Sequence, residues 1–301
     1  MGDCVSLIEK ALEKQSAEHS SDLGEEKNDL DIQVDVSSKS EEKEKEHWND
    51  LASSNKNYIK VDLDFFKEKG MLSPDDPHGQ LAEEYRIIKQ PLLLNAFGEG
   101  KNEIENANLI LVTSSLPGEG KTFTSVNLAM SIATELDKRV LLVDADVVKP
   151  AASKLFGVEE RSGLIDLLEK DVTFKEVLLR TDFPKLTFLP AGRRHKHATE
   201  LLSSDAMRKL AKEMSQRYPD RIIIFDSPPL LATTQASVLA KHVGQVVLVV
   251  EAESTPQYIV QESAASLSEC DVVGCVLNKT KQGFGLGYYA YYGYKYYNYN
   301  N

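Results

Sequence analysis

The 301-residue sequence has only three cysteines, Cys4, Cys270 and Cys275, and no two of them form a CxxC pair. A disulfide framework is therefore not expected, and no stretch resembles a cleavable signal peptide. This pattern is typical of a protein kept in a reducing cytoplasm. The longest apolar runs, such as residues 246–250, are far shorter than the roughly 20 residues that a membrane-spanning helix needs. Contact with a membrane would consequently require a partner.

Basic charge is also scarce, because the formal net charge of the chain is −12. Residues 1–57 hold 15 acidic and 7 basic side chains and so account for −8 of this charge. Since nucleic-acid binding needs a basic footprint, nucleic acid is not an expected partner. Residues 1–57 also have few aromatic side chains, so they offer too little apolar surface to offset the entropy of ordering. They are predicted to be a mostly disordered arm, with a short amphipathic helix at residues 5–14 where a partner could dock.

Six short runs rich in Leu, Ile and Val recur after residue 108. Their nearly continuous apolar character predicts strands buried on both faces, and the segments between them are long enough for crossover helices. The runs are residues 109–113, 140–144, 186–189, 222–226, 246–250 and 272–277. Before them, apolar residues at helical spacing predict a helix over residues 80–94. The sequence therefore predicts an α/β domain over residues 58–280, with a mostly parallel sheet flanked by helices.

A glycine-rich segment, SLPGEGKT at residues 115–122, lies between the first of these strands and a predicted helix at 123–136. In such a loop the backbone amides turn inward around phosphates, and the helix N-terminus adds partial positive charge. Lys121 would reach the β and γ phosphates of ATP, and Thr122 would bind Mg²⁺. The sequence thus predicts a P-loop NTPase. The predicted nucleotide-binding residues of the loop are Ser115, Pro117, Gly118, Glu119, Gly120, Lys121, Thr122 and Phe123.

Three aspartates end two of the predicted strands. Asp144 ends the strand at 140–144 and Asp146 lies two residues beyond it, and Asp226 ends the strand at 222–226. A single aspartate at a strand end is more often a turn former or a helix cap. Three of them in this order after a phosphate-binding loop favour a site that holds and orients a metal bound to nucleotide.

Together with LPAG at 189–192, ELL at 200–202, FDSPP at 225–229 and LNK at 277–279, these motifs resemble those of the bacterial tyrosine kinases that control polysaccharide chain length. The similarity is particularly to the exosortase-associated autokinases of exopolysaccharide clusters, and it spans about residues 80–301.

The resemblance implies a tyrosine autokinase that uses ATP and Mg²⁺. It implies that Asp144 is the base for the tyrosine hydroxyl and that Asn278 lies near the adenine, although an Asn-Lys pair also simply ends strands. The implied ligands of the metal, directly or through water, are Thr122, Asp146 and Asp226. The family commonly has arginine where this chain has Val148.

The predicted helix at 80–94 carries Glu83, Arg86 and Lys89, which the spacing places on one helical face. By itself such a face is an ordinary solvated salt-bridge stripe. The resemblance implies that this helix packs against the neighbouring subunit of a ring, although the family usually has arginine in place of Lys89.

Residues 281–301 form a tyrosine-dense tail without acidic residues or apolar periodicity, and they are predicted to be disordered. The resemblance implies that the tail tyrosines accept phosphate, in trans, under the control of a tyrosine phosphatase. It also implies a cytoplasmic position at the inner face of the membrane through a Wzz-like chain-length determinant protein. Eight of the chain's twelve tyrosines lie in the tail, namely Tyr288, Tyr289, Tyr291, Tyr292, Tyr294, Tyr296, Tyr297 and Tyr299.

Two alternative functions use the same loop. A ParA or MinD type ATPase would use ATP-dependent dimerisation as a switch, but such proteins usually have a lysine where this loop has Leu116. A nucleotide-dependent scaffold without catalysis would have no need of the intact set of Lys121, Asp144, Asp146 and Asp226. The tyrosine tail favours the kinase over both.

Overall fold

The computed structural model describes residues 57–98, 104–217 and 220–281. Residues 1–56 of the predicted arm, with its helix at 5–14, and the tyrosine cluster of the tail lie outside this part of the chain.

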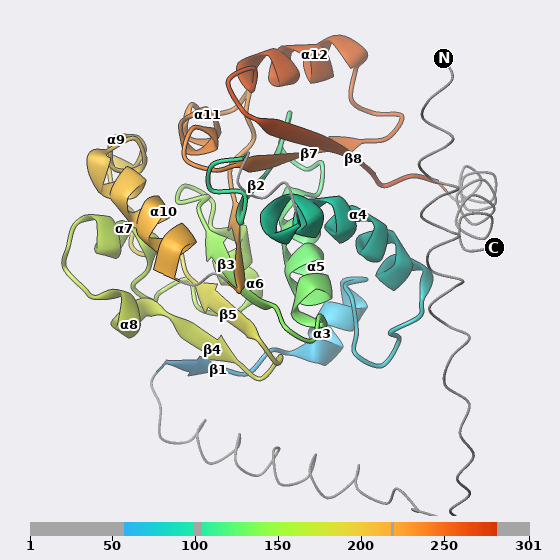
Figure 1. The fold of residues 1–301 in the computed structure, drawn as a ribbon, viewed down its shortest axis with the longest axis horizontal. Coiled ribbons are helices and arrows are strands. Elements are labelled where there is room, and N and C mark those ends of the chain that lie inside the picture. The colour runs from blue at the N-terminus through green and yellow to red at the C-terminus, as the bar shows by residue number, and fades with distance from the viewer. Residues whose placement is uncertain (1–56, 99–103, 218–219, 282–301) are drawn as a thin grey trace, which may run out of the picture. The chain divides into compact units, whose positions relative to one another are not determined.

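The strands of the described residues form one eight-stranded sheet in the order β1-β4-β5-β3-β6-β2-β7-β8 (Figure 1). Neighbouring strands are parallel, except that β4 is antiparallel to β5. The strands are β1 (Tyr58–Ile59), β2 (Leu109–Ser114), β3 (Arg139–Asp144), β4 (Leu179–Thr181), β5 (Leu186–Leu189), β6 (Arg221–Asp226), β7 (Gln245–Glu251) and β8 (Val272–Asn278). The predicted α/β fold with a mostly parallel sheet is confirmed.

All six strands expected from the sequence are present, with bounds within one residue of the prediction. The two short strands β1 and β4 were not predicted, because two or three residues are too few to show a period. The expected burial on both faces is wrong for β8, where Val273 is 42% and Leu277 59% exposed. The reason is its place at the sheet edge, where β7 is its one neighbour among the strands of the described residues.

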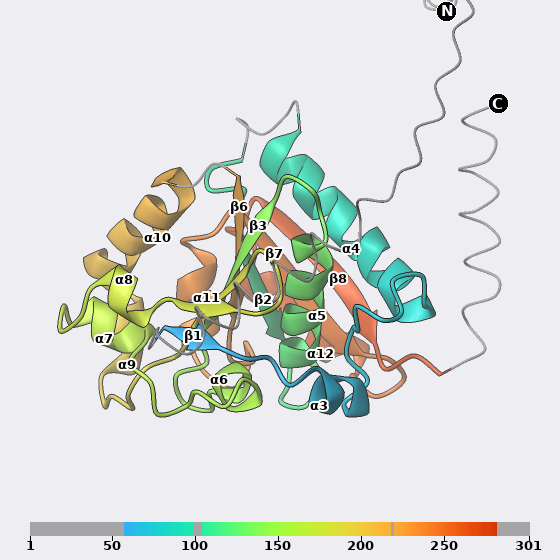
Figure 2. The same cartoon turned by 90° about the horizontal axis from the view of Figure 1, so that it is seen from below.

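Helices cover both faces of the sheet (Figure 2). Alternate residues of the inner strands belong to two separate hydrophobic clusters, one on each face. Ile110 and Val112 of β2 face the cluster with α3 to α6, whereas Leu109 and Leu111 face the cluster with α7 to α11. The helices are α3 (Leu63–Glu68), α4 (Gln80–Phe97), α5 (Lys121–Ala133), α6 (Ala151–Leu155), α7 (Leu164–Leu168), α8 (Phe174–Val177), α9 (Ala198–Leu202), α10 (Asp205–Arg217), α11 (Gln235–Ala240) and α12 (Gln257–Ser266).

The parallel pairing brings the carboxyl ends of β2, β3, β6, β7 and β8 to one edge of the sheet. Ligands of open α/β sheets bind at this edge, and the glycine-rich loop and the three aspartates all lie there. Among the residues that the structure describes, no helix combines the length and the apolar character that crossing a membrane would require.

Candidate nucleotide and metal site

The glycine-rich loop connects β2 to α5 with two turns that only glycine adopts readily. Gly118 has a φ of 92° and Gly120 a φ of 97°, both in the left-handed region. A Cβ atom on Gly120 would lie 2.0 Å from Asn278 Nδ2, whereas nothing lies within 4 Å of the corresponding position on Gly118. The loop is therefore open on the Gly118 side. A glycine turn of this kind before the N-terminus of a helix is the usual setting in which backbone amides bind phosphate.

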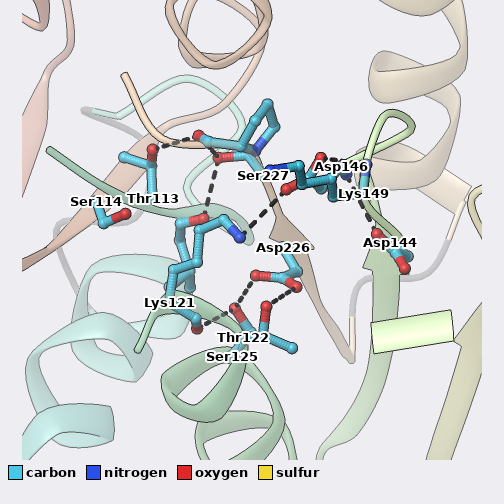
Figure 3. A network of polar contacts seen from close by, with 12 residues as sticks. Thr113, Ser114, Lys121, Thr122, Ser125, Asp144, Asp146, Lys149, Asp226 and Ser227 are labelled. Carbon is cyan, nitrogen blue, oxygen red and sulfur yellow. Dashed lines mark hydrogen bonds and ion pairs between the residues drawn. The ribbon is translucent and has the colours of Figure 1, made fainter. Parts of the chain in front are cut away.

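Lys121, the first residue of α5, lies across the site from the loop that follows β3. Its Nζ is 3.2 Å from Asp146 Oδ2, and the lysine side chain is 15% exposed (Figure 3). The Asp146 carboxylate also accepts a hydrogen bond of 3.0 Å from the Lys149 amide. A cation and a carboxylate thus face each other where the phosphates and metal of a bound nucleotide would lie.

Asp226, at the end of β6, is fully buried beneath the start of α5. Thr122 Oγ1 donates to Asp226 Oδ2 over 2.8 Å, and Ser125 Oγ lies 3.0 Å from Asp226 Oδ1 (Figure 3). Burial raises the pKa of the Asp226 carboxyl, while Lys121 and the two hydroxyls oppose that shift. A hydroxyl bonded to a carboxylate at this point of a P-loop is the donor set that suits Mg²⁺.

Asp144 is the strand partner of Asp226, so the two carboxylates leave adjacent strands at the same register. The side chain of Asp144 is fully buried and accepts hydrogen bonds from the amides of Ser153, at 2.7 Å, and Asp146, at 3.2 Å. Burial, followed by repulsion from Asp226, raises the pKa of the Asp144 carboxyl. Its ionised form is consequently a stronger proton acceptor than an exposed aspartate.

Sequence reasoning missed two residues that hold these carboxylates. Ser125 lies one helical turn after Thr122, so its contact with Asp226 follows from the spacing once the helix is known to begin at Lys121. Ser153 binds Asp144 through its amide and accepts a 3.1 Å hydrogen bond from the Ala191 amide at its Oγ. Nothing in the sequence indicates this second link, because it joins α6 to the LPAG segment after β5.

Asn278 and Glu119 make contacts within the site that the sequence did not indicate, and their predicted roles in nucleotide binding stay predictions. Asn278 Nδ2 donates to the backbone carbonyl of Glu119 over 2.9 Å, so its observed contact is with the loop. Proximity of Asn278 to the adenine stays a prediction. The Glu119 side chain is 2% exposed and points into the protein, away from the open side of the loop. Of the remaining loop residues, Pro117 is exposed, Ser115 is buried and Phe123 packs against the core.

The three residues predicted to share one face of α4, Glu83, Arg86 and Lys89, do not share one environment. Glu83 and Arg86 form an exposed ion pair, with side chains 41% and 46% exposed. Lys89 is 5% exposed; its Nζ donates to Ser131 O over 2.8 Å and lies 2.7 Å from Glu135 Oε1. The placement of Lys89 on the exposed face is therefore wrong. Its spacing of four residues from Tyr85 and three from Leu92 puts it on the buried stripe, with its ammonium group reaching the end of α5.

The parallel sheet, the glycine loop before α5 and the strand-end aspartates define the class of P-loop nucleotide-binding proteins. A family model described as an AAA domain matches residues 107–262. The tyrosine-protein kinase YwqD of Bacillus subtilis is 30% identical over 230 residues, which are 76% of this chain and 93% of that protein. The chain belongs to the family of bacterial tyrosine-protein kinases. The exosortase-associated subgroup stays a prediction.

Other relatives are longer, and solved kinase domains share the fold. The tyrosine-protein kinase Wzc of Salmonella typhimurium is 29% identical over 238 residues, and this chain covers only 31% of its length. The VpsO kinase domain is 29% identical with a TM-score of 0.58, covering 69% of this chain and 100% of that domain. The kinase domain of the Escherichia coli tyrosine kinase ETK, 24% identical with a TM-score of 0.60, supports the fold alone.

Proposed function

We propose that this kinase transfers the γ-phosphoryl group of ATP to the tyrosines of its own C-terminal cluster, in trans between copies, and so regulates exopolysaccharide synthesis or export. The observation that carries the proposal is the Lys121–Asp146 and Thr122–Asp226 arrangement at the phosphate loop. It occurs in a chain that places eight tyrosines between residues 288 and 299.

Each group of the site has a role in this reaction. The amides of the loop and the Lys121 ammonium bind and orient the phosphate chain. Thr122, Asp146 and Asp226 would hold Mg²⁺, which when bound neutralises charge on the phosphate oxygens. Asp144 accepts the proton of the tyrosine hydroxyl, an assignment supported by its place beside Asp146 and by the raised pKa of its carboxyl. Asn278 would contribute to the adenine side of the site from the end of β8.

A mixing experiment tests both the activity and its direction. A full-length Lys121→Met chain supplies tyrosines without transfer, and an otherwise unaltered chain truncated after Gly287 supplies transfer without the cluster. With ATP and Mg²⁺, we expect phosphotyrosine on the full-length Lys121→Met chain only when both are present, mapped by mass spectrometry to residues 288–299. If the wild-type chain becomes phosphorylated by itself but the Lys121→Met chain in the mixture does not, transfer occurs in cis. Nucleotide-dependent dimers without phosphotyrosine would favour the ParA or MinD type switch.

We further propose that copies of the chain assemble into a ring through the exposed face of α4. Beside the Glu83–Arg86 pair this face carries two large apolar side chains, Ile87 at 53% and Leu94 at 65% exposure. Exposed apolar residues beside charged ones are typical of protein interfaces. Lys89 is excluded from this contact because its ammonium group is bound within the chain.

Replacing Glu83 and Arg86 by alanine should shift the protein toward monomer in sedimentation and lower phosphorylation in trans. The melting temperature should change little, because an exposed ion pair contributes about 0–1 kcal/mol to stability. The matched control is the exposed pair Asp205 and Arg208 on α10, also three residues apart. An unchanged size distribution in the α4 variant would show that the exposed face of α4 is not a subunit interface and that its ion pair is only solvated.

A membrane chain-length determinant protein of the Wzz-like type and a tyrosine phosphatase complete the proposed system. The chain-length determinant protein would hold the kinase at the inner face of the membrane, and the phosphatase would remove phosphate from the tyrosines of the tail. Support for both comes from the family to which the chain belongs. A pull-down with and without residues 1–20 would test whether the segment at 5–14 is the docking site.

A further inference from the structure

The carboxylate of Glu119 is buried inside the phosphate loop and hydrogen-bonded on both oxygens. The amide of Leu116 donates to Oε2 over 2.7 Å, and the Thr255 hydroxyl donates to Oε1. The Glu251 amide lies 3.5 Å from the same Oε1. A carboxylate that is only 2% exposed needs such donors, since burying it without partners would be strongly unfavourable.

These contacts fasten the loop to two neighbouring strands. Glu251 ends β7 and Thr255 lies in the turn before α12, so the side chain of Glu119 ties the loop to β7. The backbone carbonyl of Glu119 accepts from Asn278 at the end of β8. Glu119 is therefore the point at which the phosphate loop meets the ends of β7 and β8.

We propose that Thr255 is a positioning residue for nucleotide binding, acting through the Glu119 carboxylate; the proposal rests on the proposed role of the loop in binding ATP. The loop turns at Gly118 and Gly120, and glycine allows many backbone conformations. Without other restraints the loop could therefore adopt conformations that do not bind phosphate. The hydrogen bond from Thr255 restricts that freedom before nucleotide arrives, so less ordering is needed on binding. Thr255 is half-buried and belongs to none of the sequence motifs. It contacts the loop through the hydrogen bond from its hydroxyl to Glu119.

The test is Thr255→Val, which keeps the shape of the side chain and removes the donor. We expect the affinity for a fluorescent ADP analogue with Mg²⁺ to fall about five- to tenfold, which is the usual scale for the loss of one intramolecular hydrogen bond. The KM for ATP should rise by a similar factor while kcat changes by less than about twofold, because the hydroxyl does not touch the reacting atoms. Thr255→Ser should restore both values, and Thr255→Ala should behave as Thr255→Val.

The matched control is Thr181→Val in β4, which lies toward the opposite edge of the sheet from β7 and β8. The Thr181 hydroxyl is buried and lies 2.9 Å from the carbonyls of Phe183 and Leu186. This variant should lower the melting temperature without changing nucleotide affinity. Unchanged ADP affinity and KM in Thr255→Val, or a loss that Thr255→Ser does not restore, would overturn the proposal. If the wild-type chain does not bind the ADP analogue at all, the proposed role of the loop in nucleotide binding is wrong, which distinguishes this failure from a failure of the role of Thr255.

Discussion

Lys121→Met is expected to abolish autophosphorylation, with a loss of about 100-fold or more, as for other groups that stabilise developing charge. The ammonium group of Lys121 lies 3.2 Å from Asp146 and lowers the pKa of Asp226. Methionine fills a similar volume without the charge. The carboxyl pKa of Asp226 should then rise further, so the variant loses both a phosphate contact and part of its metal affinity. Phosphotyrosine is measured by immunoblot and mass spectrometry, and nucleotide affinity with fluorescent ADP.

Three further variants separate the roles within the site. Lys154→Met, at an exposed position of α6, is the control and should keep full activity. Asp226→Asn should resemble Lys121→Met, because both remove phosphate or metal contacts and leave the core packing intact. Asp144→Asn should lose phosphoryl transfer more than nucleotide affinity, as expected of a base. Undiminished phosphotyrosine in Lys121→Met would refute the site assignment, and an equal loss of transfer and affinity in Asp144→Asn would make Asp144 a binding residue.

Truncation after Gly287 should remove nearly all phosphotyrosine while nucleotide binding persists. It deletes eight of the twelve tyrosines. Of the tyrosines that the structure describes, Tyr85 is 4% exposed with its pKa raised to about 12 by burial, whereas Tyr258 is 67% exposed. A chain extends by roughly 3.3 Å per residue, so the 20 residues after Lys281 can span about 65 Å and reach a neighbouring site. The control is Tyr258→Phe in the full-length chain, which should keep most of the signal.

The same truncation should keep the assembly together in the presence of ATP, as judged by particle size. Each tyrosine phosphate adds about −1.5 to −2 charges at neutral pH. Two such groups about 10 Å apart repel by roughly 1–2 kcal/mol in water, of which salt leaves about a third. Summed over several tyrosines in every subunit, this repulsion reaches a few kcal/mol and favours separate subunits in the wild type. Full phosphotyrosine in the truncated chain would mean that the cluster is not the main acceptor.

Local sequence patterns sufficed for the larger part of the fold. All six apolar runs form strands, and five of these strands lie inside the sheet. Both faces of an inner strand are buried, so its sequence is apolar throughout instead of alternating between apolar and polar residues. The same reasoning failed for β8, since an apolar run does not reveal whether a second neighbour will pair with the strand. Helix α4 was predicted from its period, but the period did not by itself show that Lys89 shares the stripe of Tyr85 and Leu92.

The sequence by itself determined the phosphate loop, the three strand-end aspartates and the tyrosine cluster, because each is a contiguous pattern whose chemistry depends on its own residues. The tertiary structure decided which groups hold them. It placed Ser125 against Asp226, Ser153 against Asp144, and Thr255 with Asn278 around Glu119. Thr255 and Asn278 are more than 130 residues from Glu119, and Ser125 is 101 residues from Asp226. Such contacts follow from strand order and helix rotation, which are set by packing across the whole sheet rather than by any local pattern.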